Sequence, residues 1–164
     1  MTLPEQERER FCQVLHHSRT SLYRLAFSIT RNSSDAQEAV AEAVCRVYER
    51  YPQLREKEKL PRWLLKITAN EARRLCQRRG RTVSLDDLPT EPAIPGRETG
   101  DDTLWQAVQT LPRDQREAVV LFYYEDLPTE EIARIVGTSP GAVRVRLSRA
   151  REKLRSILKE GDYG

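Results

Sequence analysis

Residues 130–158 read EEIARIVGTSPGAVRVRLSRAREKLRSIL, and this stretch decides the fold. A short apolar-rich segment, Thr129 to Val136, runs into the tight-turn sequence Gly137-Thr138-Ser139. Ser139 is a preferred N-cap residue and Pro140 suits the first turn of a helix, so a second helix begins there. Its apolar face recurs at steps of three and four: Val143, Leu147, Ala150, Leu154 and Ile157. The stretch predicts a helix-turn-helix, a motif whose second helix enters the major groove of DNA.

Basic side chains crowd the second of these predicted helices. They are Arg144, Arg146, Arg149, Arg151, Lys153, Arg155 and Lys159, opposed only by Glu152 and Glu160. Arginine pairs with phosphates and reads guanine edges in bidentate fashion. A solvated amphipathic helix would carry the same charges. The coincidence of a basic face, a turn and a short preceding helix favours DNA binding.

Composition favours an all-α protein. Only 7 of the 164 residues are glycine, 38% are apolar and 32% are charged, and helix-forming Ala, Leu, Arg and Glu are abundant. The net charge of +3 is too small to indicate a nucleic-acid partner by itself. The three cysteines and the adjacent His16 and His17 lack the spacing of metal ligands or of a disulfide framework. No metal and no cofactor is therefore expected.

The sequence carries no targeting or membrane signal. From its polar start, MTLPEQERER, we expect no signal peptide. No apolar run approaches the ~20 residues of a membrane span. We therefore expect a cytoplasmic protein that does not insert into membranes.

The chain divides into three zones: helices over 8–80, a linker over 81–102 and helices over 103–160. The linker, RTVSLDDLPTEPAIPGRETGDD, carries three prolines and two glycines, and its acidic residues outnumber its basic ones. Prolines break helices, and a segment of low hydrophobicity cannot offset the entropy lost on ordering. The sequence therefore predicts two small helical domains joined by a flexible acidic tether.

The first zone predicts three helices. The first carries the stripe Leu22, Leu25, Ala26 and Ile29. The second is capped by Ser33, Ser34 or Asp35 and stops near Pro52. The third opens at Pro61, with Trp63, Leu64, Ile67 and Leu75 facing inward and an opposite face of Arg62, Lys66, Arg73, Arg74, Arg78 and Arg79.

The second zone begins with a stripe of Leu104, Val108 and Leu111. Pro112 suits the first turn of the next helix. The buried part of that helix is expected to be Ala118, Val119, Leu121 and Phe122. A break over 125–128 separates it from the helix-turn-helix.

Residues 111–154, LPRDQREAVVLFYYEDLPTEEIARIVGTSPGAVRVRLSRAREKL, resemble region 4 of extracytoplasmic-function sigma factors, a bacterial branch of the sigma-seventy family. LYRLAFSITRNSSDAQEAVAEAVCRVYERY and PRWLLKITANEARRLCQRR are similar to the family's region 2. The resemblance implies two helical domains and a factor that starts transcription at chosen promoters. It implies core RNA polymerase (clamp helices and flap), promoter DNA and an anti-sigma factor as partners of a monomer.

The resemblance also assigns roles to residues of region 4, which reads the −35 promoter element. Arg144, Val145, Ser148 and Arg149 take the base-facing or groove-facing positions. A second set would lie near phosphates or support the fold: Ser139, Pro140, Gly141, Arg146 and Arg151. Arg146 is open to a structural role, because closely spaced arginines on a helix cannot all face one groove.

In region 2, the resemblance implies that the helix with Asp35, Glu38 and Glu42 binds the polymerase clamp helices. The loop over 52–60 and the next helix would recognise and open the −10 element, through Trp63, Lys66, Asn70, Arg73 and Arg74. Four of these residues have a plainer alternative. Trp63 fits the core in step with Leu64 and Ile67, Asn70 fits a helix-to-loop hydrogen bond, and the two glutamates fit a solvated surface.

The sequence departs from the family pattern at several positions. Ala41 stands where a glutamine is usual, and Glu38-Ala39 replaces an Asp-Leu pair. Pro128 takes the position of a capping serine, which leaves Thr129 as the cap or shifts the helix start. A basic residue that is common near Phe122 is missing, which leaves one −35 contact without its donor.

Two other functions compete with a sigma factor. A stand-alone regulator would bind DNA tightly without polymerase, as a dimer on a palindrome. A nuclease would need clustered carboxylates, but the pairs Asp86-Asp87 and Asp101-Asp102 lie in the tether. No phosphate-binding glycine motif is present either. We therefore do not expect an enzyme.

Overall fold

The computed structural model describes residues 3–79 and 102–163, and every regular element in these two ranges is helical. The chain separates into two compact units, which we call the N-terminal and C-terminal units. The all-α, two-domain prediction is thereby confirmed. The predicted tether over 81–102 falls outside the described residues, apart from Asp102 at its end. Within the described part, no helix is long and apolar enough to cross a membrane.

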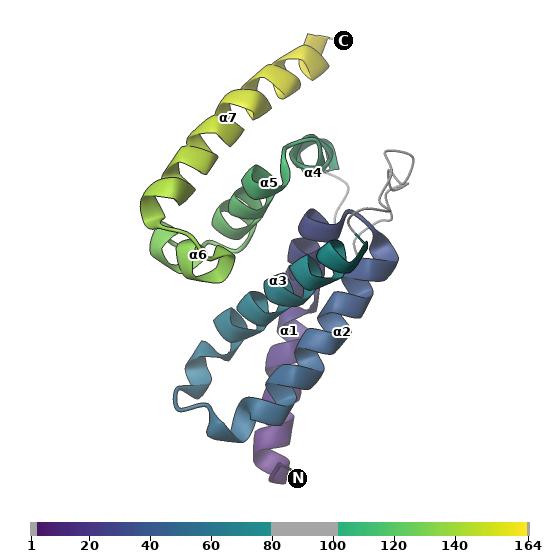
Figure 1. Cartoon of the computed structure of the whole chain (residues 1–164), viewed down its shortest axis with the longest axis vertical. Helices are drawn as coiled ribbons and strands as arrows, with labels where there is room; N and C mark the ends of the chain where they lie inside the picture. The colour runs from purple at the N-terminus through teal and green to yellow at the C-terminus, as the bar shows by residue number, and fades with distance from the viewer. Residues whose placement is uncertain (1–2, 80–101, 164) are drawn as a thin grey trace. The chain divides into compact units, whose positions relative to one another are not determined.

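The N-terminal unit is a bundle of three helices: α1 (Glu5–Thr30), α2 (Ser33–Arg50) and α3 (Leu60–Arg79). Each of them packs against the other two (Figure 1). Two short 3-10 turns, η1 (Tyr51–Gln53) and η2 (Lys57–Lys59), join α2 to α3. Three alanines on α2 are fully buried, so the helix backbones lie close there: Ala36, Ala39 and Ala43. The predicted stripe of α1 is buried as well: Leu22, Leu25, Ala26 and Ile29.

The turn between α1 and α2 is set by two residues. Arg31 ends α1 in the left-handed conformation, with φ of 52°. Asn32 then caps α2, because its side-chain oxygen accepts a hydrogen bond of 2.9 Å from the Asp35 amide. The prediction of Ser33, Ser34 or Asp35 as the cap was wrong by one residue, since four adjacent residues can all cap a helix.

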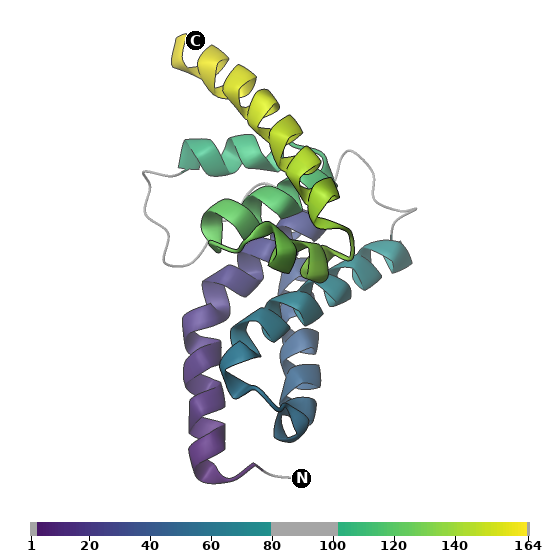
Figure 2. The same cartoon turned by 90° about the vertical axis from the view of Figure 1, so that its left-hand side faces the viewer.

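The C-terminal unit contains α4 (Asp102–Gln109), α5 (Arg113–Val119), the π-helical turn η5 (Val120–Tyr124), α6 (Thr129–Val136) and α7 (Pro140–Tyr163). The short helices α4, α5 and α6 all pack against α7. Figures 1 and 2 show the short α6 turning directly into the long α7. The largest fully buried side chains of this unit are Leu111, Leu121, Ile132 and Leu147.

Several packing predictions for this unit need correction. Leu104, the first residue of the predicted stripe, is 37% exposed, whereas Val108 and Leu111 are buried as predicted and Trp105 is buried as well. Phe122 is only half-buried. Pro112 precedes α5 as its N-cap residue rather than standing in its first turn.

The capping prediction for α6 was also wrong. Thr129 is the first residue of the helix, and Pro128 is its N-cap residue, without a side-chain cap. The Pro128 carbonyl accepts from the amides of Glu131 and Ile132, each at 3.0 Å. The bounds of α6 at Thr129 and Val136 match the prediction.

Candidate nucleic-acid interface

The start of α7 is fixed by turn chemistry. Gly137 ends α6 with φ of 78°, and its amide donates to the Ala133 carbonyl at 2.8 Å. The Ser139 hydroxyl accepts a hydrogen bond of 3.1 Å from the Ala142 amide, which caps α7 as predicted. Pro140 occupies the first position of the helix. These local contacts set the direction in which α7 leaves the turn.

The buried side of α7 decides which residues face outward. Val143, Leu147 and Ala150 are almost completely buried against the rest of the unit. The remaining helical positions place four predicted residues together on the opposite, exposed side: Arg144, Val145, Ser148 and Arg149. We call these four residues the α7 face. It combines two guanidinium groups, a hydroxyl and an aliphatic side chain, and Val145 is 47% exposed.

Gly141 lies in the first turn, beside this face. A Cβ atom added at Gly141 would lie 3.8 Å from Nη2 of Arg144 and 3.9 Å from Oγ of Ser139. The Arg144 guanidinium therefore turns back toward the first turn of α7. Cations and helix N-terminal amides both attract phosphate, so this end of the helix suits a DNA backbone.

Arg146 and Arg151 point toward the protein instead. Nε of Arg146 lies 3.7 Å from a carboxylate oxygen of Asp114 at the start of α5. Nε of Arg151 donates to the Tyr123 hydroxyl at 2.5 Å, and its guanidinium lies 5.7 Å from the ring centres of Phe122 and Tyr123. Both arginines thus fasten α7 to the preceding helices. Of the two roles left open for them, the contacts favour support of the fold.

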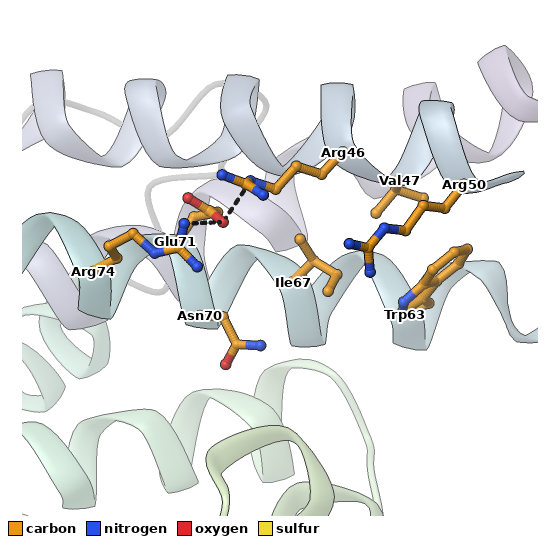
Figure 3. Close-up of a pocket in the computed structure, with 8 residues that line it drawn as sticks. All are labelled: Arg46, Val47, Arg50, Trp63, Ile67, Asn70, Glu71 and Arg74. Atoms are coloured by element: carbon orange, nitrogen blue, oxygen red, sulfur yellow. Dashed lines mark ion pairs between the residues drawn. The ribbon is translucent and has the colours of Figure 1, made fainter.

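The N-terminal unit carries a hollow of about 200 Å³ between α2 and α3 (Figure 3). Figure 3 shows Trp63 and Arg50 at one end, and Glu71 with Arg46 and Arg74 at the other. The full lining is Arg46, Val47, Arg50, Trp63, Ile67, Asn70, Glu71 and Arg74. Trp63 and Ile67 are half-buried here, so the prediction that they face the core is only partly right.

Glu71 organises the arginines of this hollow. Its side chain is 7% exposed, and a carboxylate oxygen lies 2.8 Å from Nε of Arg46 and 3.7 Å from Nη1 of Arg74. Arg46 also pairs with Glu42 at 3.5 Å. A buried carboxylate is costly unless cations compensate it, so Glu71 holds both arginines at the hollow. Sequence reasoning missed it, although Glu71 falls four residues after Ile67 and four before Leu75, on the apolar register.

The other residues predicted for the −10 element lie along α3. Lys66, Asn70 and Arg73 follow at steps of four and three, so they share one side of the helix, next to the hollow. Nη1 of Arg73 donates to the Asn70 side-chain oxygen at 3.4 Å, within α3 itself. The five predicted residues therefore form one continuous surface, because Trp63 and Arg74 border the same strip.

The loop that precedes α3 is tied down by Lys57. Its ammonium group donates to the carbonyls of Tyr51 and Leu54 at 2.7 and 3.0 Å. It also lies 4.4 Å from the centre of the Tyr51 ring. Burial raises the pKa of the Tyr51 phenol above its usual value. Lys57 was predicted only as part of the loop over 52–60, and its role depends on carbonyls that the sequence does not reveal.

The three acidic residues predicted to bind polymerase divide into two kinds. Asp35 is buried and pairs with Arg79 of α3, so its carboxylate joins two helices of the bundle. Glu38 and Glu42 are exposed on α2, one turn apart. Glu38 also lies 3.6 Å from Nη2 of Arg79. Only the two glutamates offer carboxylates on the surface.

The comparisons with known proteins concern the family of the chain. Two family models match the chain: Sigma-70 region 2 over residues 14–82, and Sigma-70, region 4 over residues 101–154. The RNA polymerase sigma factor SigV of Bacillus subtilis is 32% identical over 142 residues, which cover 85% of this chain and 86% of the relative. The ECF RNA polymerase sigma factor EcfG of Rhodopseudomonas palustris is 31% identical over 143 residues, covering 84% and 79%.

The chain belongs to the extracytoplasmic-function sigma factors. Sigma factors of this family direct promoter-specific initiation of transcription by RNA polymerase. A solved structure supports the assignment: the sigma factor RpoE in complex with the anti-sigma factor NepR, from Bartonella quintana. It matches with a TM-score of 0.76 and 26% identity, over 95% of this chain and 98% of that one.

Region 4 of the sigma factor also has a surface hollow that its sequence did not reveal. This apolar hollow, of about 290 Å³, lies between α4, α5, η5 and α7. Its lining is Leu104, Val119, Tyr123, Tyr124, Arg151, Leu154, Arg155 and Leu158. The exposure of Leu104 and Tyr123, at 37% and 49%, belongs to this hollow. Trp105, Val108 and Leu111 also follow helical spacing, and a stripe through these three residues would have left Leu104 at the surface.

Proposed function

We propose that this sigma factor divides promoter recognition between its two units, with boundaries near residues 8–80 and 103–160. The C-terminal unit reads the −35 element as duplex DNA, and the N-terminal unit binds polymerase and the −10 element. The observation that carries this proposal is the α7 face. It exposes Arg144, Val145, Ser148 and Arg149 on the second helix of a capped helix-turn-helix, where such motifs touch base edges.

At the −35 element, the α7 face supplies the contacts that carry sequence information. Arg144 and Arg149 have guanidinium groups that bind guanine or phosphate, and Ser148 donates or accepts at either kind of base pair. Ser139, Pro140 and Gly141 lie at the helix start, near the phosphate backbone. Arg146 and Arg151 act indirectly, because their contacts with Asp114 and Tyr123 hold α7 in place.

At the −10 element, the hollow between α2 and α3 receives part of the opened strand. Arg50 and Arg74 supply positive charge at its two ends, and Trp63 offers an aromatic surface. Single-stranded nucleic acid binds such combinations of a basic groove and stacking side chains. Lys66, Asn70 and Arg73 extend this surface along α3.

Polymerase contacts fall to the exposed side of α2, through Glu38 and Glu42. Asp35 contributes through its ion pair with Arg79, which fixes α2 against α3. An anti-sigma factor is a further proposed partner, since RpoE of Bartonella quintana was solved with NepR. The factor acts in the cytoplasm, where polymerase and the promoter are found, and it performs no catalysis of its own.

A reconstitution with purified core RNA polymerase tests this function. The chain is mixed with core enzyme, and bound complexes are recovered and used for run-off transcription from a promoter library. We expect stable binding and initiation from promoters that share a −35/−10 pair. Tight duplex binding without polymerase, together with no capture of polymerase, would instead identify a stand-alone regulator.

A further inference from the structure

Val145 is the one member of the α7 face that cannot form a hydrogen bond with its side chain. It is 47% exposed, in the second turn of α7, between Arg144 and Arg146 in sequence. Isolated exposed apolar residues are common on protein surfaces, so exposure alone indicates little. The position of Val145 is informative because its neighbours on the same face are two arginines and a serine, all suited to DNA.

The stability of α7 gives no reason for a valine there. Valine has a lower helix propensity than arginine, lysine or alanine, because its branched Cβ loses rotamer freedom in a helix. Its buried neighbours Val143 and Leu147 already provide the packing on the inner side of α7. A valine at an exposed helix position therefore fits better with a contact made outside the protein.

The major groove presents few apolar groups to such a side chain. Guanine, adenine and cytosine offer hydrogen-bond donors and acceptors there, whereas thymine adds its C5-methyl group. A stiff aliphatic side chain loses little rotamer freedom on contact. Such a side chain distinguishes thymine from the other bases through this methyl group.

Building on the proposed function, we propose that Val145 contacts the methyl group of one thymine in the −35 element and thereby selects thymine at that position. Burying one methyl group contributes about fourfold in affinity. The arginines and Ser148 supply the polar part of the readout, and Val145 adds a preference that no hydrogen bond can provide.

The test replaces each thymine of the −35 element, one at a time, with deoxyuridine. Deoxyuridine keeps the base pair and removes only the methyl group. Affinity of the holoenzyme, made from this chain and core polymerase, is measured on each duplex promoter. We expect one position, on either strand, where the wild-type holoenzyme loses about fourfold in affinity.

Two variants assign that loss to its side chain. With Val145→Ser, the thymine-to-deoxyuridine ratio at that position should fall to about one. With Arg149→Ala as the matched control, affinity should fall on both templates while the ratio stays near fourfold. Cytosine at the same position should bind wild-type holoenzyme more tightly once it carries a 5-methyl group, and Val145→Ser should remove this gain.

Several results would overturn the proposal. If deoxyuridine changes the affinity at no thymine, while the holoenzyme initiates normally, a methyl contact is excluded and the proposed function is unaffected. A ratio that survives Val145→Ser would assign the contact to another residue. A selected −35 element made only of G·C pairs would leave no methyl group to read. Failure to bind polymerase or initiate at all would remove the proposed function together with this inference.

Discussion

Two arginines on α7, two residues apart, are expected to behave differently when they are removed. Arg149 belongs to the exposed α7 face, whereas Arg151 donates to Tyr123 and lies over two aromatic rings. Arg149→Ala should cost about 1–3 kcal/mol at the −35 element and relax the base preference there, with unfolding unchanged. An equal loss on every sequence would assign Arg149 to a phosphate.

Arg151→Ala should lower the unfolding free energy by about 1–2 kcal/mol, the sum of a cation–π contact and a hydrogen bond. Urea unfolding and promoter binding, measured on both variants, separate the two effects.

The same residues show which side-chain positions could be predicted from the sequence and which could not. The buried stripe of α7 could be predicted because helical periodicity is a local property. The four residues of the α7 face came from the resemblance to region 4. The inward direction of Arg146 and Arg151 could not be predicted, because it depends on Asp114 and Tyr123, about 30 residues earlier in the chain. Glu71 was missed for the same reason, since its partner Arg46 lies on another helix.

At the scale of elements, the turn between α6 and α7 depends on a single glycine. Gly137 has φ of 78°, and no atom beyond its two chain neighbours lies within 4 Å of an added Cβ, so a substitution there meets strain but no clash. Gly137→Ala should therefore destabilise the protein by about 1–2 kcal/mol. Asparagine tolerates the left-handed conformation better, so Gly137→Asn should cost less. Thermal unfolding of both variants checks this order, and equal losses would point to a steric cause instead.

The loop before α3 offers a second prediction at this scale. Lys57 donates to two carbonyls, whereas Lys59 pairs only with the exposed Glu56 at 3.4 Å. Charge-assisted hydrogen bonds contribute more than exposed ion pairs. Lys57→Ala should thus cost about 1–3 kcal/mol of unfolding free energy and slow opening of the −10 element. Lys59→Ala is the matched control and should leave both nearly unchanged. Similar defects in the two variants would show that overall charge matters, rather than the order of the loop.

Elements were predicted best where turn chemistry is encoded within a few residues. Gly137, Ser139 and Pro140 placed the end of α6 and the start of α7 correctly. Prediction failed where several neighbours offer the same chemistry, as with the cap of α2, for which Asn32 competes with Ser33, Ser34 and Asp35. It also failed for Leu104 at the start of α4, because Leu104 and Trp105 are both in helical step with Val108 and Leu111, and only Trp105 is buried.

At the scale of the whole molecule, the two units should fail at different steps of initiation. Loss of a contact on α7 removes affinity for closed duplex DNA, whereas loss of a contact in the α2–α3 hollow acts once strands separate. Trp63 decides whether this division holds, because its half-buried ring is open to a structural role as well as to base stacking. The two roles differ in how they respond to DNA that is already open.

Trp63→Ala should therefore impair opening of the −10 element, since stacking contributes about 1–3 kcal/mol per base. Permanganate reactivity of thymines in that element measures the opening, and Trp63→Phe should retain most of the opening.

A promoter with a pre-formed bubble needs no melting, so run-off transcription from it separates melting of the duplex from capture of the strand. If Trp63 only helps to melt the duplex, the bubble restores Trp63→Ala to wild-type levels. If Trp63 holds a base in the hollow, the bubble restores it only in part, and protein stability stays unchanged. A loss of unfolding free energy that matches the loss of transcription would make Trp63 a packing residue and move the site of strand capture to Lys66, Asn70 and Arg73.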